Sequence, residues 1–270
     1  SLTADWVSWS IPKPAWEDVV RGAQGTNRRT FGYNPSFLYP AAGGIDHLPR
    51  AFLPHVRPPR LRTEVVRIHA RDRRATLSSG ETLRYSTMLS TIPLPSLIER
   101  IEDAPPDLKE SARGLRYVSV VNLNLGFDAP SPRSYQWVYF PEPEFPFYRV
   151  GIYSNLSAAT VPAGASGFYV EISYAPGRTP DVERLTDESA AALRRVGLVP
   201  AGARLRCARA VDIPCAYVIH DRLRRNSLEA MRDALRRAGI LSVGRYGAWE
   251  YSAMEDALSH GRQAAHLIGE

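Results

Sequence analysis

The sequence predicts an α+β fold in which helices pack on a mixed sheet. Several segments alternate apolar and polar residues, as strands do, and others space their apolar residues three or four apart, as helices do. The two kinds of segment interleave without regular βα alternation, and the middle of the chain has antiparallel hairpin character. The 270 residues are 44% hydrophobic and 23% charged, which excludes a disordered, collagenous or coiled-coil chain.

The first third of the chain predicts two short helices and a three-stranded meander. One helix is expected near residues 15–22, and the spacing of Ile45, Leu48 and Phe52 indicates another. The pair Gly43-Gly44 precedes this second helix and would let the backbone approach a ligand at its N-terminus. Alternation then predicts strands around residues 63–70, 75–77 and 83–85, and the compact run 87–93 is typical of a buried strand.

The rest of the chain predicts a set of longer strands and amphipathic helices. The strands are expected over residues 117–127, 136–140, 147–154, 167–174, 205–211 and 240–243. The helices are expected over residues 95–101, 106–114, 183–197, 227–239 and 252–268.

The segment that joins the last strand to the last helix is the most informative for function. Gly244 and Gly247 flank a turn, and Ser252 with Glu255 forms a capping-box pattern that predicts where the helix begins. A helix N-terminus facing the end of a strand suits an anionic or electron-rich ligand. An ordinary strand–turn–helix with a well-formed cap is the alternative interpretation.

Charge and composition limit the classes of partner. The net charge is +6, and all but two of the 34 basic residues are arginines, yet no basic tail or aromatic-interleaved stripe occurs. We therefore expect no nucleic acid partner and no membrane span, because no apolar run is long enough. The two cysteines and six histidines lack metal-ligand spacing, so no metal is expected. Nothing indicates an oxidising compartment, and we expect a cytoplasmic location.

Four blocks in order along the chain resemble one family of flavoenzymes. They are Gly32-Tyr33-Asn34 with Gly43-Gly44, then Leu89-Ser90-Thr91-Ile92-Pro93, then Trp137-Val138-Tyr139-Phe140-Pro141 through Tyr148-Arg149 to Ser154-Asn155, and finally Gly244-Arg245-Tyr246-Gly247 through Met254-Glu255-Asp256. Together they are similar to the UDP-galactopyranose mutase family. More loosely, they resemble the wider amine oxidase and protoporphyrinogen oxidase group of FAD enzymes.

The resemblance implies an FAD-dependent enzyme that interconverts the pyranose and furanose forms of a UDP-sugar through flavin N5, without net redox change. It implies these substrate-binding residues: Asn34, Tyr139, Arg149, Asn155, Tyr217 and Tyr251. It implies these cofactor-binding residues: Gly43, Gly44, Gly244, Arg245, Met254, Glu255 and Asp256. It assigns no catalytic residue.

The sequence departs from the family pattern at three places. A second diphosphate arginine is replaced by Ser10, a family tyrosine is Leu156, and no G-x-G-x-x-G motif of a dinucleotide-binding strand–turn–helix occurs. The chain thus resembles the C-terminal part of a longer flavoprotein, in which FAD binding by this chain alone is expected to be weak or absent. An amine oxidase-type or protoporphyrinogen oxidase-type oxidoreductase, and a non-catalytic remnant that binds a nucleotide sugar or a partner subunit, stay open as alternatives.

The resemblance also predicts how the chain divides. Residues 1–35 and 96–238 are expected to form a substrate-binding lobe, and residues 36–95 and 239–270 part of an FAD-binding, Rossmann-like lobe that includes the meander. An apolar face around residues 87–93 and 240–243 should then be uncovered, which predicts self-association.

Overall fold

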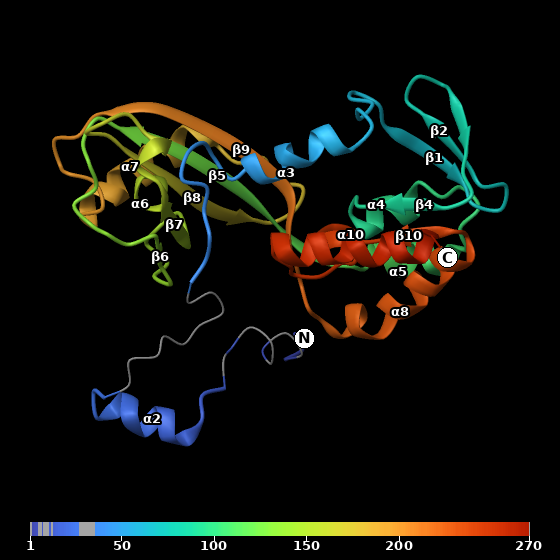
Figure 1. Ribbon diagram of the computed structural model, residues 1–270, viewed down its shortest axis with the longest axis horizontal. Helices are drawn as coiled ribbons and strands as arrows, with labels where there is room; N and C mark the ends of the chain where they lie inside the picture. The colour runs from blue at the N-terminus through green and yellow to red at the C-terminus, as the bar shows by residue number, and fades with distance from the viewer. Residues whose placement is uncertain (1, 5–6, 8–10, 12, 27–35, 270) are drawn as a thin grey trace.

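Two lobes joined by a pair of long strands make up the molecule (Figure 1). The computed structural model describes the chain except residues 1, 5–6, 8–10, 12, 27–35 and 270. The joining strands are β5 (Tyr117–Phe127) and β9 (Leu205–Val218), which pair antiparallel over most of their length. Helices and several sheets, one of them a three-stranded antiparallel sheet, confirm the predicted α+β class.

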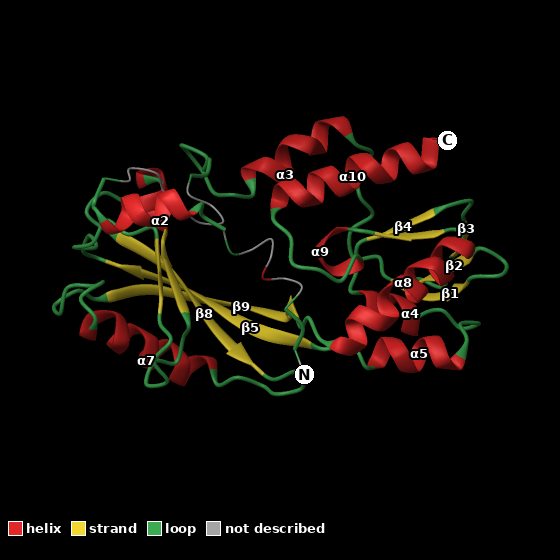
Figure 2. Cartoon of the chain, turned by 90° about the horizontal axis from the view of Figure 1, so that it is seen from below, coloured by secondary structure: helices red, strands yellow, loops and turns green. Residues whose placement is uncertain are grey.

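The first lobe is built on a five-stranded antiparallel sheet in the order β6-β7-β8-β5-β9. Its shorter strands are β6 (Trp137–Tyr139), β7 (Arg149–Ile152) and β8 (Ser166–Tyr174). Helix α7 (Val182–Arg195) lies along one face of this sheet (Figure 2). The alternation in these segments therefore separates a face that packs on α7 from a face that is free for other contacts.

The strand register sorts side chains onto the two faces. Val138, Val150 and Val170 pair across β6, β7 and β8, and they contact the hydrophobic core that includes Leu193 of α7. The next row consists of Tyr139, Arg149, Glu171 and Asn122, which are also paired across neighbouring strands. Successive residues of a strand point to opposite faces, so this polar row lies on the face away from α7.

The second lobe holds the meander and a short parallel pair of strands. The meander runs β1 (Val65–His69), β2 (Arg74–Leu77) and β3 (Thr82–Arg84). Strand β4 (Met88–Ser90) pairs parallel with β10 (Ile240–Ser242). The longer helices here are α4 (Leu94–Glu99), α5 (Pro106–Arg113), α8 (Arg222–Arg237) and α10 (Met254–Gly269). The other described helices are α2 (Trp16–Ala23), α3 (His47–Phe52), η1 (Leu53–His55), α6 (Tyr153–Leu156), η2 (Ala158–Thr160) and α9 (Gly244–Gly247).

Two boundaries differ from the sequence prediction for identifiable reasons. Strand β9 continues past the expected end to Val218 although it contains Pro214. This is possible because β9 is the edge strand of the sheet, so a residue without a backbone N–H breaks no hydrogen bond to a strand on its outer side. Helix α8 begins at Arg222, since the Asp221 side chain accepts a hydrogen bond from the backbone N–H of Arg224 at 2.9 Å.

The predicted capping box at the last helix is wrong. The Asp256 carboxylate accepts a hydrogen bond from the backbone N–H of Ala253 at 2.7 Å, whereas the buried Ser252 hydroxyl finds no hydrogen-bond partner in the part of the chain that the structure describes. The carboxylate that reaches back to the helix start is thus Asp256 and not Glu255, and α10 begins at Met254.

The core of the second lobe combines segments from both predicted lobes. Leu97 of α4 and Met231 of α8 share this core with Ile68 of the meander and Ile240 of β10. The residue limits of the two functional lobes stay a prediction. Leu89 of β4 is 46% exposed and the nearby Ile92 is also exposed, but self-association through this surface likewise stays a prediction. No helix in the described part of the chain is long and apolar enough to cross a bilayer.

We expect a side chain at position 151 to destabilise the sheet. A Cβ on Gly151 would lie 1.9 Å from Cε1 of the Tyr169 ring, which covers this glycine on the polar face of the sheet. Gly151→Ala should lower the free energy of unfolding by about 1–3 kcal/mol, because the ring must move. Urea denaturation measures this loss. The matched control is Gly202→Ala, whose Cβ would meet open space; we expect it to change stability by less than about 0.5 kcal/mol. Equal stability of the two variants would contradict the packing described.

Candidate functional site

A buried carboxylate organises the polar face of the five-stranded sheet. Glu171 of β8 is 7% exposed and accepts hydrogen bonds from the Arg149 guanidinium and from the Tyr148 hydroxyl. The Tyr217 hydroxyl of β9 donates to the same carboxylate at 3.1 Å. Three donors from two segments of the chain, residues 148–149 and strand β9, therefore converge on one side chain, as a buried charge requires.

This arrangement fixes the protonation of the groups around Glu171. Burial acts to lower the pKa of Arg149, but the hydrogen bond and charge of Glu171 outweigh it and raise that pKa. Burial, together with the hydrogen bond to Glu171, raises the pKa of Tyr148, and burial raises the pKa of Tyr217. At neutral pH, Arg149 is thus a cation and both tyrosines are hydrogen-bond donors.

Arg149 keeps an unused donor beside this cluster. Its Nη2 atom contacts Glu171 and also donates to the Tyr217 hydroxyl at 3.1 Å, and its guanidinium lies 5.9 Å from the ring centroid of Tyr139. The Nε atom is buried and has no hydrogen-bond partner among the described residues. A buried unpaired donor costs about 1–3 kcal/mol, so a bound acceptor would be stabilised here.

A second arginine lies on two stacked tyrosines next to this cluster. The rings of Tyr217 and Tyr251 are stacked at 6.0 Å, and the Arg245 guanidinium lies 5.0 Å and 4.7 Å from their centroids. Arg245 also donates to the backbone carbonyls of Ser252 at 2.9 Å and Ala216 at 3.0 Å. The tyrosine pair therefore links the Glu171 cluster on the sheet to the turn at α9.

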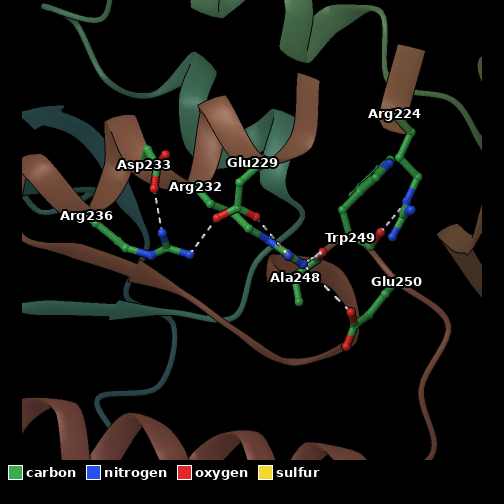
Figure 3. A network of polar contacts seen from close by, with 8 residues as sticks. All are labelled: Arg224, Glu229, Arg232, Asp233, Arg236, Ala248, Trp249 and Glu250. Atoms are coloured by element: carbon green, nitrogen blue, oxygen red, sulfur yellow. Dashed lines mark hydrogen bonds and ion pairs between the residues drawn. The ribbon is translucent and has the colours of Figure 1, made fainter. Parts of the chain in front are cut away.

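The turn after α9 is held by arginines of α8, as Figure 3 shows. Arg232 donates to the carbonyl of Ala248 at 2.7 Å, and Arg224 donates to the carbonyl of Trp249 at 2.8 Å. Trp249 is fully buried with φ 53°, a left-handed conformation that costs an L-residue about 1–3 kcal/mol. The two arginines thus fix the strained backbone that places Arg245 and Tyr251.

The start of α9 has the geometry of a ligand cradle. Gly244 follows the carboxyl end of the parallel strand β10, and open sheets of this kind bind ligands at such ends. Its φ is +75°, and a Cβ at this position would meet open space. The Ser252 hydroxyl, which has no partner among the residues described, is buried in the chain segment that follows. These features fit the polar edge of a planar cofactor.

The structure brings together five of the residues that the sequence singled out. Tyr139, Arg149, Tyr217, Tyr251 and Arg245 form one connected cluster.

The remaining predicted residues lie outside that set of contacts. Asn155 of α6 donates to the carbonyls of Arg133 and Tyr135 at 2.8 and 2.7 Å, which holds the loop before β6. Gly43, with φ +77°, and Gly44 precede α3. Met254, Glu255 and Asp256 form the first turn of α10. Asn34 lies outside the described residues.

Sequence reasoning missed the central residue of the cluster. In β8, the core residues Val170 and Ile172 alternate with Tyr169 and Glu171, which point to the opposite face. Tyr169 packs over Gly151 on that face. The alternation of β8 signalled that Glu171 points away from α7. The alternation could not identify the partner of Glu171, because Arg149 is brought next to it only by the register of β7 against β8.

In the described part of the chain, no cluster of potential metal ligands occurs. The His, Cys, Asp and Glu side chains of this part do not gather in a group of three or more that could hold a metal ion.

Comparison with solved structures shows what this architecture is similar to. A crystal structure of reduced UDP-galactopyranose mutase superposes with a TM-score of 0.89 at 24% sequence identity, covering 99% of this chain and 61% of that one. A protein described as a protoporphyrinogen oxidase from Exiguobacterium sp. 255-15 gives a TM-score of 0.65 at 16% identity, covering 83% of this chain and 51% of that one. At these identities the likeness shows the fold, and this chain spans less than two thirds of either structure.

The family follows from the sequence match over nearly the whole chain. The model of flavin containing amine oxidoreductases matches residues 16–269. This range includes both lobes, the Glu171 cluster and the turn at α9. The protein therefore belongs to the flavin-containing amine oxidoreductase family.

Proposed function

We propose that this protein is part of an FAD-dependent enzyme that isomerises the pyranose and furanose forms of a nucleotide sugar. The observation that carries the proposal is the buried Nε of Arg149, which has no hydrogen-bond partner within the described ranges and lies among tyrosines beside the α9 cradle. A guanidinium matches phosphate oxygens in geometry and charge. The similarity to a UDP-galactopyranose mutase structure supports the same reading of the fold.

Each residue of the cluster has its own role in the proposed binding of the substrate. Arg149 supplies the charged donor for a phosphate, and Glu171 holds its guanidinium in place. Arg245 supplies a second positive charge at the stacked pair Tyr217 and Tyr251, which replaces part of the charge lost with the second family arginine. The tyrosine rings exclude water from one side of the substrate.

The cofactor is proposed to lie at the α9 cradle. Gly244, Arg245 and the first turn of α10, with Met254, Glu255 and Asp256, would face its polar edge, and Gly43 with Gly44 would approach it from the other segment. A reduced flavin bound there would supply the nucleophile for the anomeric carbon of the sugar. The protein's own part is to hold the diphosphate so that this carbon lies next to the cradle.

An amine oxidase-type or protoporphyrinogen oxidase-type oxidoreductase is the second candidate. The ion pair itself favours it, because Glu171 already neutralises the charge of Arg149 and a diphosphate carries more than one negative charge. A non-catalytic remnant that binds a nucleotide sugar or a partner subunit is the third candidate. The proposed location of the protein is the cytoplasm.

The reaction can be tested directly. We expect this chain alone to be inactive, so the test uses the longer enzyme of which it is proposed to be part. That enzyme, reduced with dithionite, should convert UDP-galactofuranose to UDP-galactopyranose without net consumption of reductant, because the isomerisation involves no net redox change. Chromatography of the nucleotide sugars measures this conversion. Oxygen-dependent oxidation of an amine or a polycyclic substrate, with no isomerisation, would decide for the oxidoreductase.

Removal of the Arg149 guanidinium should weaken UDP binding. We expect a loss of roughly 1.5–3 kcal/mol, the value of a charged hydrogen bond, in calorimetric titration with UDP. Because Arg149→Ala leaves Glu171 buried and unpaired, Arg149→Met combined with Glu171→Gln tests the same loss without that charge. Arg84→Ala, an exposed residue of β3, is the control and should bind UDP as the parent does. Unchanged affinity in the double variant would remove Arg149 from the substrate site.

Flavin loading tests the extent of the cofactor site in this chain. We expect the purified protein to be colourless or weakly yellow, because the sequence holds no glycine-rich turn for the pyrophosphate. The visible absorbance of released flavin, relative to protein, measures the occupancy. A tightly held, stoichiometric FAD would refute the expectation.

A further inference from the structure

A second hollow lies on the first lobe, away from the α9 cradle. Its volume is about 700 Å³, and its lining comes from β5, β8, β9 and the loop of residues 160–165. Pockets for small molecules typically measure about 300–1,000 Å³, so a compact organic ligand fits. The lining is mostly apolar and includes Val161, Pro162 and Ala163.

Two glycines determine how the wall of the hollow is built. Gly126 of β5 faces Gly167 of β8 in the strand register. A Cβ on Gly167 would lie 2.9 Å from Cγ1 of Val161, and one on Gly126 would lie 2.6 Å from the sulfur of Cys207. The side chains of Val161 and Cys207 therefore occupy the space that a side chain at either glycine would need.

The polar component of the hollow is cationic. Arg206 and Arg209 of β9 line it and are exposed. Among the described residues, neither is paired with a carboxylate, whereas the neighbouring Arg204 binds Asp128 at 2.9 Å. Asp128 also lines the hollow, and its charge interacts with Arg206 as well as with Arg204. The lining therefore keeps one net positive charge beside an apolar wall.

We propose that this hollow binds a small amphipathic carboxylate. The apolar part would lie against the loop of residues 160–165, which removes that surface from water. The carboxylate would lie between Arg206 and Arg209, because a guanidinium forms strong bidentate hydrogen bonds with a carboxylate. A neutral apolar ligand would leave that net positive charge without a partner, and a small hydrophilic anion would leave the apolar wall uncovered.

The proposed site is separate from the Glu171 cluster but adjoins its support. Tyr153 lines the hollow, donates to the side-chain oxygen of Asn124 at 2.9 Å and contacts the ring of Tyr169 at 5.2 Å. Tyr169 in turn covers Gly151, next to Arg149 in β7. Two tyrosine rings thus form the partition between the hollow and the cluster, and the proposal does not rest on the nucleotide-sugar function.

Cys207 provides a built-in reporter for occupancy. It is exposed and lines the hollow, whereas Cys215 is half-buried and burial raises its pKa to about 11. N-ethylmaleimide reacts with thiolates, so Cys207 should be modified much faster than Cys215 near neutral pH. Peptide mass spectrometry measures the two rates in the intact protein, with Cys215→Ser as a background that leaves one thiol.

Decanoate below its micelle concentration is the probe. We expect saturating decanoate to slow the modification of Cys207 at least tenfold, and 1-decanol at the same concentration to slow it far less. The double variant Arg206→Ala/Arg209→Ala should lose the protection by decanoate while its thermal unfolding is unchanged. The charge-matched control Arg84→Ala/Arg178→Ala changes two exposed arginines elsewhere and should keep the protection.

Three results would overturn the proposal. They are absence of protection by decanoate, equal protection by 1-decanol, and full protection in the Arg206→Ala/Arg209→Ala variant. The second and third would show that the hollow recognises apolar surface alone.

Discussion

The buried carboxylate of Glu171 is the constraint on which the polar face of the sheet depends. A carboxylate removed from water is stable only with several donors, and here they come from β7, from β9 and from the residue before β7. Each donor is thereby fixed in position and protonation. Loss of one partner from a buried pair of this kind typically costs about 3–5 kcal/mol, so the site and the stability of the lobe are built from the same contacts.

The sequence predicted the elements of the fold better than their ends. Alternation indicates β8, because one face of that strand is buried and period two is then unambiguous. Strand β5 is indicated instead by a long run that is apolar on both sides. The extension of β9 through Pro214 depends on its position at the edge of the sheet, and the start of α8 at Arg222 depends on the cap that Asp221 provides. The cap of α10 failed for a similar reason, since Asp256 and Glu255 are equivalent in sequence but only one reaches the backbone of Ala253.

Prediction of the site succeeded where a motif was local and failed where the register was needed. The resemblance identified Arg149 and Arg245 from short blocks, and their neighbours Tyr217 and Tyr251 from the same source. Nothing in those blocks pairs Arg149 with Glu171, which is 22 positions away along the chain. The sequence could not single out the α8 arginines that hold the turn at Trp249, because the chain is rich in arginine throughout. Only their hydrogen bonds to backbone carbonyls in the structure show their role.

The pairing of β5 with β9 has a mechanical consequence for the molecule. One end of β5 places Phe127 in the core of the first lobe, and the other end places Tyr117 edge-on against Trp249 in the core of the second. Between them the register shifts at residues 118–120, where Ser119 donates to the carbonyl of Pro214 at 2.6 Å. A bulge disrupts the hydrogen-bond ladder locally and bends the strand that carries it. The two strands therefore connect the two cores directly, and the ladder between those cores is interrupted at this register shift.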